Sequence, residues 1–269
     1  MTRRSAAPLL ALSLVCAACG PALMKLPAGP GAPAADAEEA ILAATAACRP
    51  VSTVSLEMSV SGSIAGGRVR GRLLAGVTRL GAARLEAVAP AGQPVFILTN
   101  GLGFVQPDAT LLLSRDNRVL ERGRFGAVLE AVTGIPLNAQ NLFAVLTGCA
   151  PTGIDEGSAL GDDWRLLTDG LYAVYVHREK DGSWRLLATV GLMGTGWRAE
   201  YGDFQEGLPR RIRLTSARPG AFDLTIALSQ VEVNPPLPDE VFRIQIPVSA
   251  NPITLDELKT SGPLGANGR

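Results

Sequence analysis

The feature of this chain that most restricts its fold is an alternation of apolar and polar side chains that returns repeatedly between residues 53 and 233. In its first stretch Val54, Leu56, Met58 and Val60 fall on one side, and serine and glutamate side chains fall on the other. A period of two residues predicts a strand with one buried face. Such stretches return roughly every ten residues, a spacing typical of an antiparallel sandwich or barrel. We therefore expect a mainly β protein.

Turn residues separate the expected strands. Gly66 and Gly67 predict a hairpin after the first strand, and residues 179–182 predict a second hairpin. The apolar phase slips near Ser229 and Gln230, which predicts a β-bulge. The strands expected after the first cover residues 68–78, 83–88, 94–99, 110–113, 118–120, 164–167, 171–177, 184–190, 197–204, 211–215, 222–233 and 242–246.

Three helical segments accompany these strands. Residues 37–47 are rich in alanine, and Asp36 and Glu39 have the spacing of a capping box at their start. Two further helices are expected near the middle of the chain, where apolar residues recur at helical spacing. Their predicted boundaries are residues 124–133 followed by Gly134, and residues 138–147 with Asn138 as the cap and Gly148 after the end.

The N-terminus resembles a bacterial lipoprotein signal peptide. Arg3 and Arg4 precede an apolar run that ends at Cys19 and is too short to cross a bilayer as a helix. Cleavage after residues 1–18 would leave Cys19 as the first residue, with a diacylglycerol on its thiol. An ordinary secretory signal, which would release a soluble protein, is the alternative. Residues 19–35 are rich in Pro, Gly and Ala and are expected to form a flexible tether.

Composition argues against several classes of partner and chemistry. The chain has 25 basic and 25 acidic side chains, so no excess positive charge is available for nucleic acid. His177 is the only histidine, and it falls in an alternating strand where a surface position is expected. The acidic pairs lie beside Gly or Pro in expected loops, and the sequence has no metal-binding, phosphate-binding or nucleophile motif. We expect no enzyme activity, no metal and no cofactor.

Two cysteines, Cys48 and Cys149, remain once the signal and Cys19 are set aside. In an exported protein such a pair is a candidate disulfide, and two free buried thiols are the alternative.

The apolar strand faces point to one of two architectures. With 47% hydrophobic residues and two helices inserted midway, the sheet has enough apolar surface to curve into an incomplete barrel whose inner face those helices cover. Such a shape holds apolar chains. A sandwich whose apolar faces pack on each other is the alternative, and periodicity alone leaves both open.

Three stretches of the chain resemble the LolA/LolB family of lipoprotein-localisation proteins, and LolB in particular. They are a strand, turn and strand at residues 84–98, a helix pair from Thr133-Gly134-Ile135-Pro136 to Gly148, and a late Trp-x-x-x-Tyr strand at residues 197–201 with the strand at 212–215. The resemblance implies an incomplete antiparallel β-barrel with a short helical lid over an apolar cavity.

The resemblance also implies a function. LolB-like proteins accept lipoprotein acyl chains from a periplasmic lipoprotein carrier and deliver them to the outer membrane without covalent chemistry. We therefore expect a monomer, lipid-anchored in the outer membrane and facing the periplasm. The membrane-facing loop corresponds to Pro90, Ala91 and Gly92, and Ala91 stands where the family has an exposed leucine. This departure favours the alternative, a lipoprotein of the same fold that binds another amphiphile or serves as an accessory component of an envelope export system.

The half-barrel domain is expected over residues 36–246, and residues 247–269 are expected to form a poorly ordered C-terminal tail with at most one turn. A Cys48–Cys149 bridge would pin the lid to the first helix. Matching the apolar strand faces to the helices gives the candidate ligand-binding residues. They are Leu56, Met58, Val60, Leu73, Leu85, Phe96 and Leu98 for the wall, and Val128, Leu129, Val132, Leu142 and Leu146 for the lid.

Overall fold

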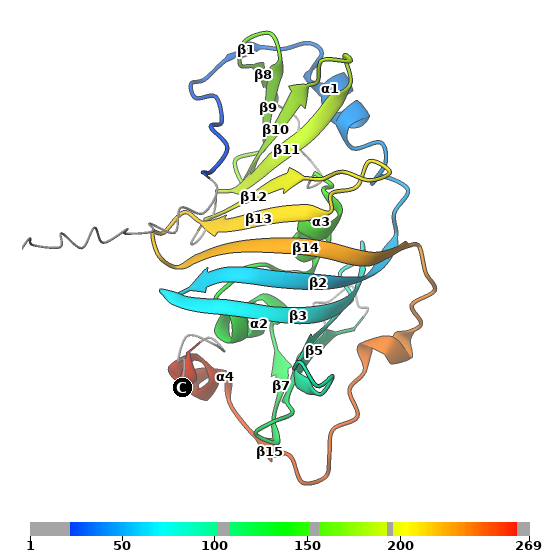
Figure 1. The fold of residues 1–269 in the computed structure, drawn as a ribbon, viewed down its shortest axis with the longest axis vertical. Helices are drawn as coiled ribbons and strands as arrows, with labels where there is room; N and C mark the ends of the chain where they lie inside the picture. The colour runs from blue at the N-terminus through cyan, green and yellow to red at the C-terminus, as the bar shows by residue number, and fades with distance from the viewer. Residues whose placement is uncertain (1–21, 102–107, 151–155, 193–195, 263–269) are drawn as a thin grey trace, which may run out of the picture.

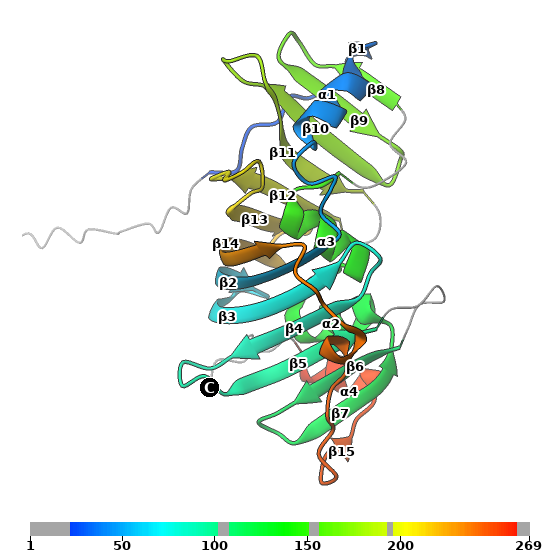
Figure 2. The same ribbon diagram turned by 90° about the vertical axis from the view of Figure 1, so that its right-hand side faces the viewer.

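The structure is a computed structural model that describes residues 22–101, 108–150, 156–192 and 196–262. These residues form an open sheet of fifteen strands, in the order β1-β8-β9-β10-β11-β12-β13-β14-β2-β3-β4-β5-β6-β7-β15, with antiparallel neighbours except for the parallel pair β7 and β15 (Figures 1 and 2). The mainly β, antiparallel prediction is therefore confirmed. The strands are β1 (Ala32–Pro33), β2 (Thr53–Ile64), β3 (Gly67–Thr78), β4 (Ala83–Val88), β5 (Pro94–Asn100), β6 (Ala109–Leu113), β7 (Arg118–Gly123), β8 (Glu156–Ala159), β9 (Trp164–Thr168), β10 (Tyr172–Arg178), β11 (Trp184–Gly191), β12 (Trp197–Gly202), β13 (Arg211–Ser216), β14 (Phe222–Val233) and β15 (Asn251–Pro252).

Helices cover one face of this sheet. In Figure 1, α2 and α3 lie behind the central strands, and we call the sheet face that they contact the covered face. The first helix packs instead against β8 to β11. In the described ranges no helix reaches the length and apolarity needed to span a bilayer. The helical elements are α1 (Ala37–Ala44), α2 (Phe125–Thr133), α3 (Ala139–Thr147), the 3₁₀ turn η1 (Asp239–Phe242) and α4 (Leu255–Ser261).

The predicted hairpins and bulge are present. Ile64 pairs with Gly67, so the turn of the β2–β3 hairpin is Ala65-Gly66, one residue earlier than predicted. Both turn residues have positive φ, 47° and 77°, as a two-residue hairpin that follows the strand twist requires. The pairing of β14 with β2 shifts between Ser229 and Glu232, which confirms the bulge.

The two mid-chain helices begin and end close to the predicted residues. Gly134 and Gly148 follow α2 and α3 in left-handed conformation, with φ of 75° and 65°. The Asn138 side chain accepts a hydrogen bond of 2.7 Å from the Asn141 backbone N–H and so caps α3. The helix boundaries could be predicted from the sequence because each capping interaction lies within a few residues of the helix end.

The prediction for the first helix was partly wrong. It ends at Ala44 rather than at residue 47, and Asp36 makes no side-chain cap. The Asp36 carboxylate instead binds the Arg165 guanidinium of β9, with Nε–Oδ1 and Nη2–Oδ2 distances of 2.7 and 2.8 Å. A two-bonded ion pair with a guanidinium satisfies this carboxylate better than one backbone N–H does.

The N-terminal segment differs from the expected flexible tether. Its described part is held at two places, by the pairing of β1 with β8 and by contacts of Met24 with β12. Cys19 and the signal peptide lie outside the described residues.

The C-terminal segment also differs from its prediction. Residues 243–246 form no strand, and β15 and α4 are ordered elements where a tail was expected. Thr254 and Glu257 form a capping box at the start of α4. Ile253 and Leu258 are buried, and α4 packs on α2, which supplies the apolar partner that the sequence reading did not find.

The Cys48–Cys149 disulfide is present, with a Cα–Cα distance of 5.6 Å. The disulfide links the segment after α1 to the residue that follows the C-cap of α3, as predicted. The two cysteines are therefore bonded and are not free thiols.

Candidate functional site

The candidate wall residues share the covered face and lie in register across four strands. Met58 pairs with Leu73, and Leu85 pairs with Leu98. Directly paired residues of an antiparallel sheet point to the same face, so these side chains form one continuous apolar surface. The wall residues by strand are Leu56, Met58 and Val60 on β2, Leu73 on β3, Leu85 on β4, and Phe96 and Leu98 on β5.

The candidate lid residues point from the helices into the same core. Val128, Leu129 and Val132 of α2 and Leu142 and Leu146 of α3 are all buried in one cluster with the wall. The two helices contact β3, β5 and β6. The structure therefore brings the predicted wall and lid residues together.

The contact between lid and wall is tight in this structure. Ten of the twelve candidate side chains are less than 9% exposed, and only Val60 and Leu73 among them are partly open. Side chains occupy the space between sheet and helices.

At one end of β2, β3 and β4, the side chains of the covered face are partly exposed to solvent. Val60 and Leu73 lie there, together with Val69 and Ala87, which are also partly exposed. Sequence reasoning did not select Val69 or Ala87, although Val69 alternates in step with Leu73 and the pattern could have found it. We call these four side chains the mouth.

The loop expected to face the membrane lies at the same end of the sheet. It follows β4, whose last residue pairs with Arg72 of β3. Ala89 and Gly92 close the turn through a backbone hydrogen bond of 2.8 Å, and Pro90 and Ala91 are exposed at its tip. The tip therefore offers a methyl group where a leucine would offer a larger apolar contact.

Side chains outside the predicted set fix α3 in place. The Arg79 guanidinium lies 5.1 Å from the centre of the Phe143 ring and donates a 2.7 Å hydrogen bond to the Cys48 carbonyl. The Tyr172 hydroxyl of β10 donates a 2.9 Å hydrogen bond to the Asn141 side chain. No periodic pattern marks these residues, because their partners are distant in sequence. Together with the disulfide they hold α3 against the sheet more firmly than α2.

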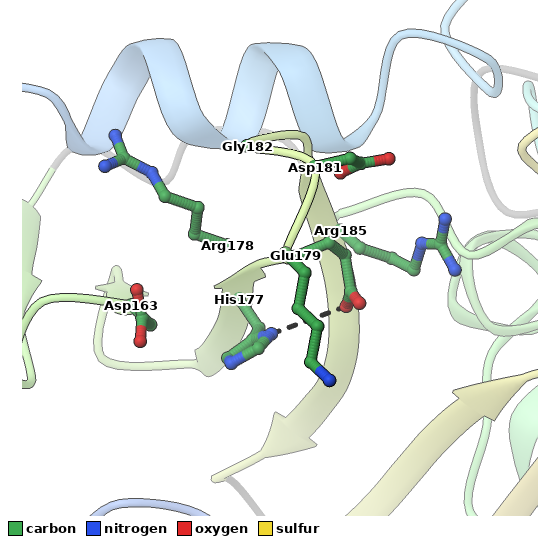
Figure 3. Close-up of a pocket in the computed structure, with 8 residues that line it drawn as sticks. Asp163, His177, Arg178, Glu179, Asp181, Gly182 and Arg185 are labelled. Carbon is green, nitrogen blue, oxygen red and sulfur yellow. Dashed lines mark hydrogen bonds and ion pairs between the residues drawn. The ribbon is translucent and has the colours of Figure 1, made fainter.

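A polar depression lies apart from the covered face, at the hairpin that joins β10 and β11 (Figure 3). It has a volume of about 770 Å³, and mostly exposed charged side chains surround it. His177 Nδ1 lies 3.4 Å from Glu179 Oε1, and the His177 ring packs 4.6 Å from that of Trp164. The Ser183 hydroxyl and backbone N–H hold the pKa of the Asp181 carboxyl below its ordinary value. The described residues contain no cluster of three or more His, Cys, Asp or Glu side chains suited to a metal.

No protein-family model and no curated protein matches the chain. Solved structures do match. A LolA superfamily protein from Nitrosomonas europaea aligns with a TM-score of 0.51 and 14% identity over 77% of this chain and 97% of its own. This chain has the LolA fold.

Two further structures align with lower scores. A DUF1329 family protein from Desulfovibrio piger has a TM-score of 0.46 and 13% identity, covering 79% of this chain and 98% of its own. A candidate outer membrane lipoprotein-sorting protein domain from Vibrio parahaemolyticus has a TM-score of 0.43 and 13% identity, covering 77% and 97%. Identity this low establishes the fold alone.

Proposed function

We propose that the protein is a lipid-anchored envelope protein that binds lipoprotein acyl chains between its sheet and the α2–α3 lid. In this proposal it delivers them to the outer membrane as LolB-like proteins do. The observation that carries the proposal is the continuous apolar covered face beneath two helices in a LolA fold. Binding and release need no covalent chemistry, so the protein is not an enzyme in this account and uses no cofactor.

The energetics of acyl binding are compatible with a closed empty state. Each CH₂ group removed from water contributes about 0.8 kcal/mol, so a long acyl chain supplies on the order of 10 kcal/mol. That gain offsets the separation of lid and wall, because the apolar side chains then contact the ligand instead of each other.

The lid is expected to open at α2 rather than at α3. The disulfide, Arg79 and Tyr172 hold α3, whereas α2 packs on the sheet and on α4 through apolar contacts. Apolar contacts re-form easily after small displacements. We therefore expect α2 and α4 to move when an acyl chain enters.

The proposed setting follows from the N-terminal sequence. A diacylglycerol on Cys19 anchors the protein in the outer membrane, where it faces the periplasm as a monomer. A periplasmic lipoprotein carrier is its proposed partner. Two or more acyl chains give the stable anchoring that one chain does not.

A second function is favoured by Ala91. Because the exposed tip of the loop lacks a leucine, the same fold and anchor suit binding of another amphiphile, or an accessory role in an envelope export system. In the first of these cases the covered face binds an apolar chain, and the ligand's head group differs.

Two adjacent leucines give a matched test. Leu73 lies on the covered face at the mouth, and Leu74 points to the opposite face, where it is 40% exposed. Native mass spectrometry with lipid extraction, on the full chain purified from envelopes and challenged with a triacylated lipopeptide, should show a one-to-one complex. Leu73→Asp should abolish the complex, and Leu74→Asp should preserve it. An empty wild-type protein that does not bind the lipopeptide would overturn the proposal.

A further inference from the structure

The N-terminal segment is held against β12 by hydrogen bonds to a buried carboxylate. Glu200 is 9% exposed, and its two carboxylate oxygens accept hydrogen bonds of 3.0 and 3.2 Å from the Met24 backbone N–H. The Arg198 guanidinium donates to the Met24 carbonyl and also pairs with Glu200. Both backbone polar groups of Met24 are therefore bound, which fixes where the chain leaves the sheet toward Cys19.

This exit point lies near one edge of the sheet, where several strands begin or end together. Trp197 at the start of β12 pairs with Ser216 at the end of β13 and with Gly191 at the end of β11. Phe222 at the start of β14 pairs with Ile64 beside the β2–β3 turn. We call this the anchor-side edge; in Figure 1 it is the left margin of the central strands.

Unpaired positive charge collects on the anchor-side edge. Lys25, Arg68, Arg70 and Arg218 are exposed there, and none of them makes an ion pair with a residue in the described ranges. The chain as a whole carries equal numbers of basic and acidic side chains, so this collection is a segregation of charge and not a general excess.

Two acidic side chains near this edge are already paired with cations, and the exposed Asp169 carboxylate accepts hydrogen bonds from the Leu171 and Tyr172 backbone N–H groups. Asp223 binds the Arg213 guanidinium at 2.8 Å, and Glu200 is occupied by Arg198 and Met24. The four free cations therefore outnumber the exposed carboxylate and leave a net positive surface toward solvent.

Exposed leucines accompany these charges. Leu171 and Leu192 are 48% and 49% exposed, and the Leu192 backbone N–H donates a 2.8 Å hydrogen bond to the Leu171 carbonyl. Leu23, next to the hydrogen-bonded Met24, is 44% exposed. Large apolar side chains interspersed with basic ones are the composition of surfaces that lie in a membrane interface.

We propose that the anchor-side edge lies against an anionic bilayer surface and orients the protein on it. The inference rests on the proposed lipid anchor in one respect. Cys19 is five residues from Met24, which holds this edge within about 17 Å of the membrane when fully extended. Basic side chains within that range are attracted by anionic head groups, and leucines gain by entering the interface.

The orientation has a consequence for the ligand. The mouth and the loop containing Ala91 lie at the same ends of β2, β3 and β4 as the β2–β3 turn. Docking of the anchor-side edge therefore turns the mouth toward the bilayer, and the broad basic and leucine surface supplies the membrane contact that Ala91 lacks.

The test is vesicle co-sedimentation of the full chain carrying Cys19→Ala, which has no acyl anchor. We expect it to bind vesicles containing phosphatidylglycerol, to bind phosphatidylcholine vesicles far less, and to dissociate as salt is raised. Removal of one basic side chain weakens such binding about fivefold. The double variant Arg68→Glu with Arg218→Glu should therefore lose at least about 25-fold, since each change removes one charge and adds a repulsive one.

A charge-matched control separates this surface from net charge. Arg49→Glu with Arg243→Glu changes two exposed cations at the opposite ends of the strands, before β2 and beside the start of β4, and should leave vesicle binding unchanged. Equal weakening by both double variants, or no binding to phosphatidylglycerol vesicles at low salt, would overturn the proposal. Lipopeptide binding by the same proteins reports on the acyl site separately, because the variants do not touch the covered face.

Discussion

At the scale of single residues, Gly123 decides how closely α2 approaches β7. A Cβ atom at this position would lie 2.4 Å from Val128 Cγ2 and 2.9 Å from Leu120 Cδ2. Gly123→Ala should therefore push the lid from the sheet and lower the free energy of unfolding by about 1–3 kcal/mol. Urea denaturation measures the change. Gly71→Ala, where no atom lies within 4 Å, is the control, and an equal loss in both variants would contradict the proposed lid contact.

The Asp36–Arg165 ion pair predicts a pH-dependent stability. The hydrogen bond from Arg165 lowers the pKa of the Asp36 carboxyl in the folded state. A lowered folded-state pKa stabilises the protein above the unfolded-state pKa, and the contribution disappears as the pH falls through the folded-state pKa. Asp36→Asn should therefore be less stable than wild type near neutral pH, and the two should converge in chemical denaturation as the pH falls through the lowered folded-state pKa of Asp36. A difference that persists in acid would contradict this account.

Individual residues show which structural features can be predicted from the sequence and which cannot. Alternation predicted the shared face of Met58, Leu73 and Leu98, because strand periodicity alone fixes which side a residue takes. It could not predict the Asp36–Arg165 pair, because the partners are 129 residues apart and the local spacing of Asp36 and Glu39 offered a nearer but incorrect partner.

At the scale of elements, the disulfide is attached at the end of α3, whereas α2 is held by apolar contacts alone. Its two cysteines are 101 residues apart, and closing a loop of that size stabilises the folded state by up to about 4.7 kcal/mol. The double variant Cys48→Ser with Cys149→Ser should lose stability by up to that amount in urea. Hydrogen exchange should rise more in α3 than in α2, and an increase confined to α2 would contradict the assigned roles.

The C-terminal elements show why a usable signal was missed. Thr254 and Glu257 have the spacing of a capping box, which is a local cue for a helix start. The following helix is short and has few apolar residues, so its sequence alone indicates marginal stability. Its order comes from burial of Leu258 near α2, a contact that depends on the tertiary fold.

At the scale of the whole molecule, periodicity left a sandwich and an incomplete barrel open, and the resemblance to the LolA/LolB family implied the incomplete barrel with a helical lid, which the open sheet confirms. Packing between lid and wall could not be predicted, because a filled core and an open cavity have the same apolar periodicity. The contact of the N-terminal segment with β12 could not be predicted either, because it depends on hydrogen bonds of a single residue, Met24, to a partner distant in the sequence.

The central claim is that an acyl chain enters between the sheet and α2. The most direct test is photo-crosslinking of the full chain with a lipopeptide that carries a photoreactive acyl group, followed by peptide mapping. Crosslinks should fall on covered-face residues of β2, β3 and β5 and on α2, and Leu73→Asp should remove them. Crosslinks confined to the exposed face that carries Leu74, or unchanged in Leu73→Asp, would contradict the account.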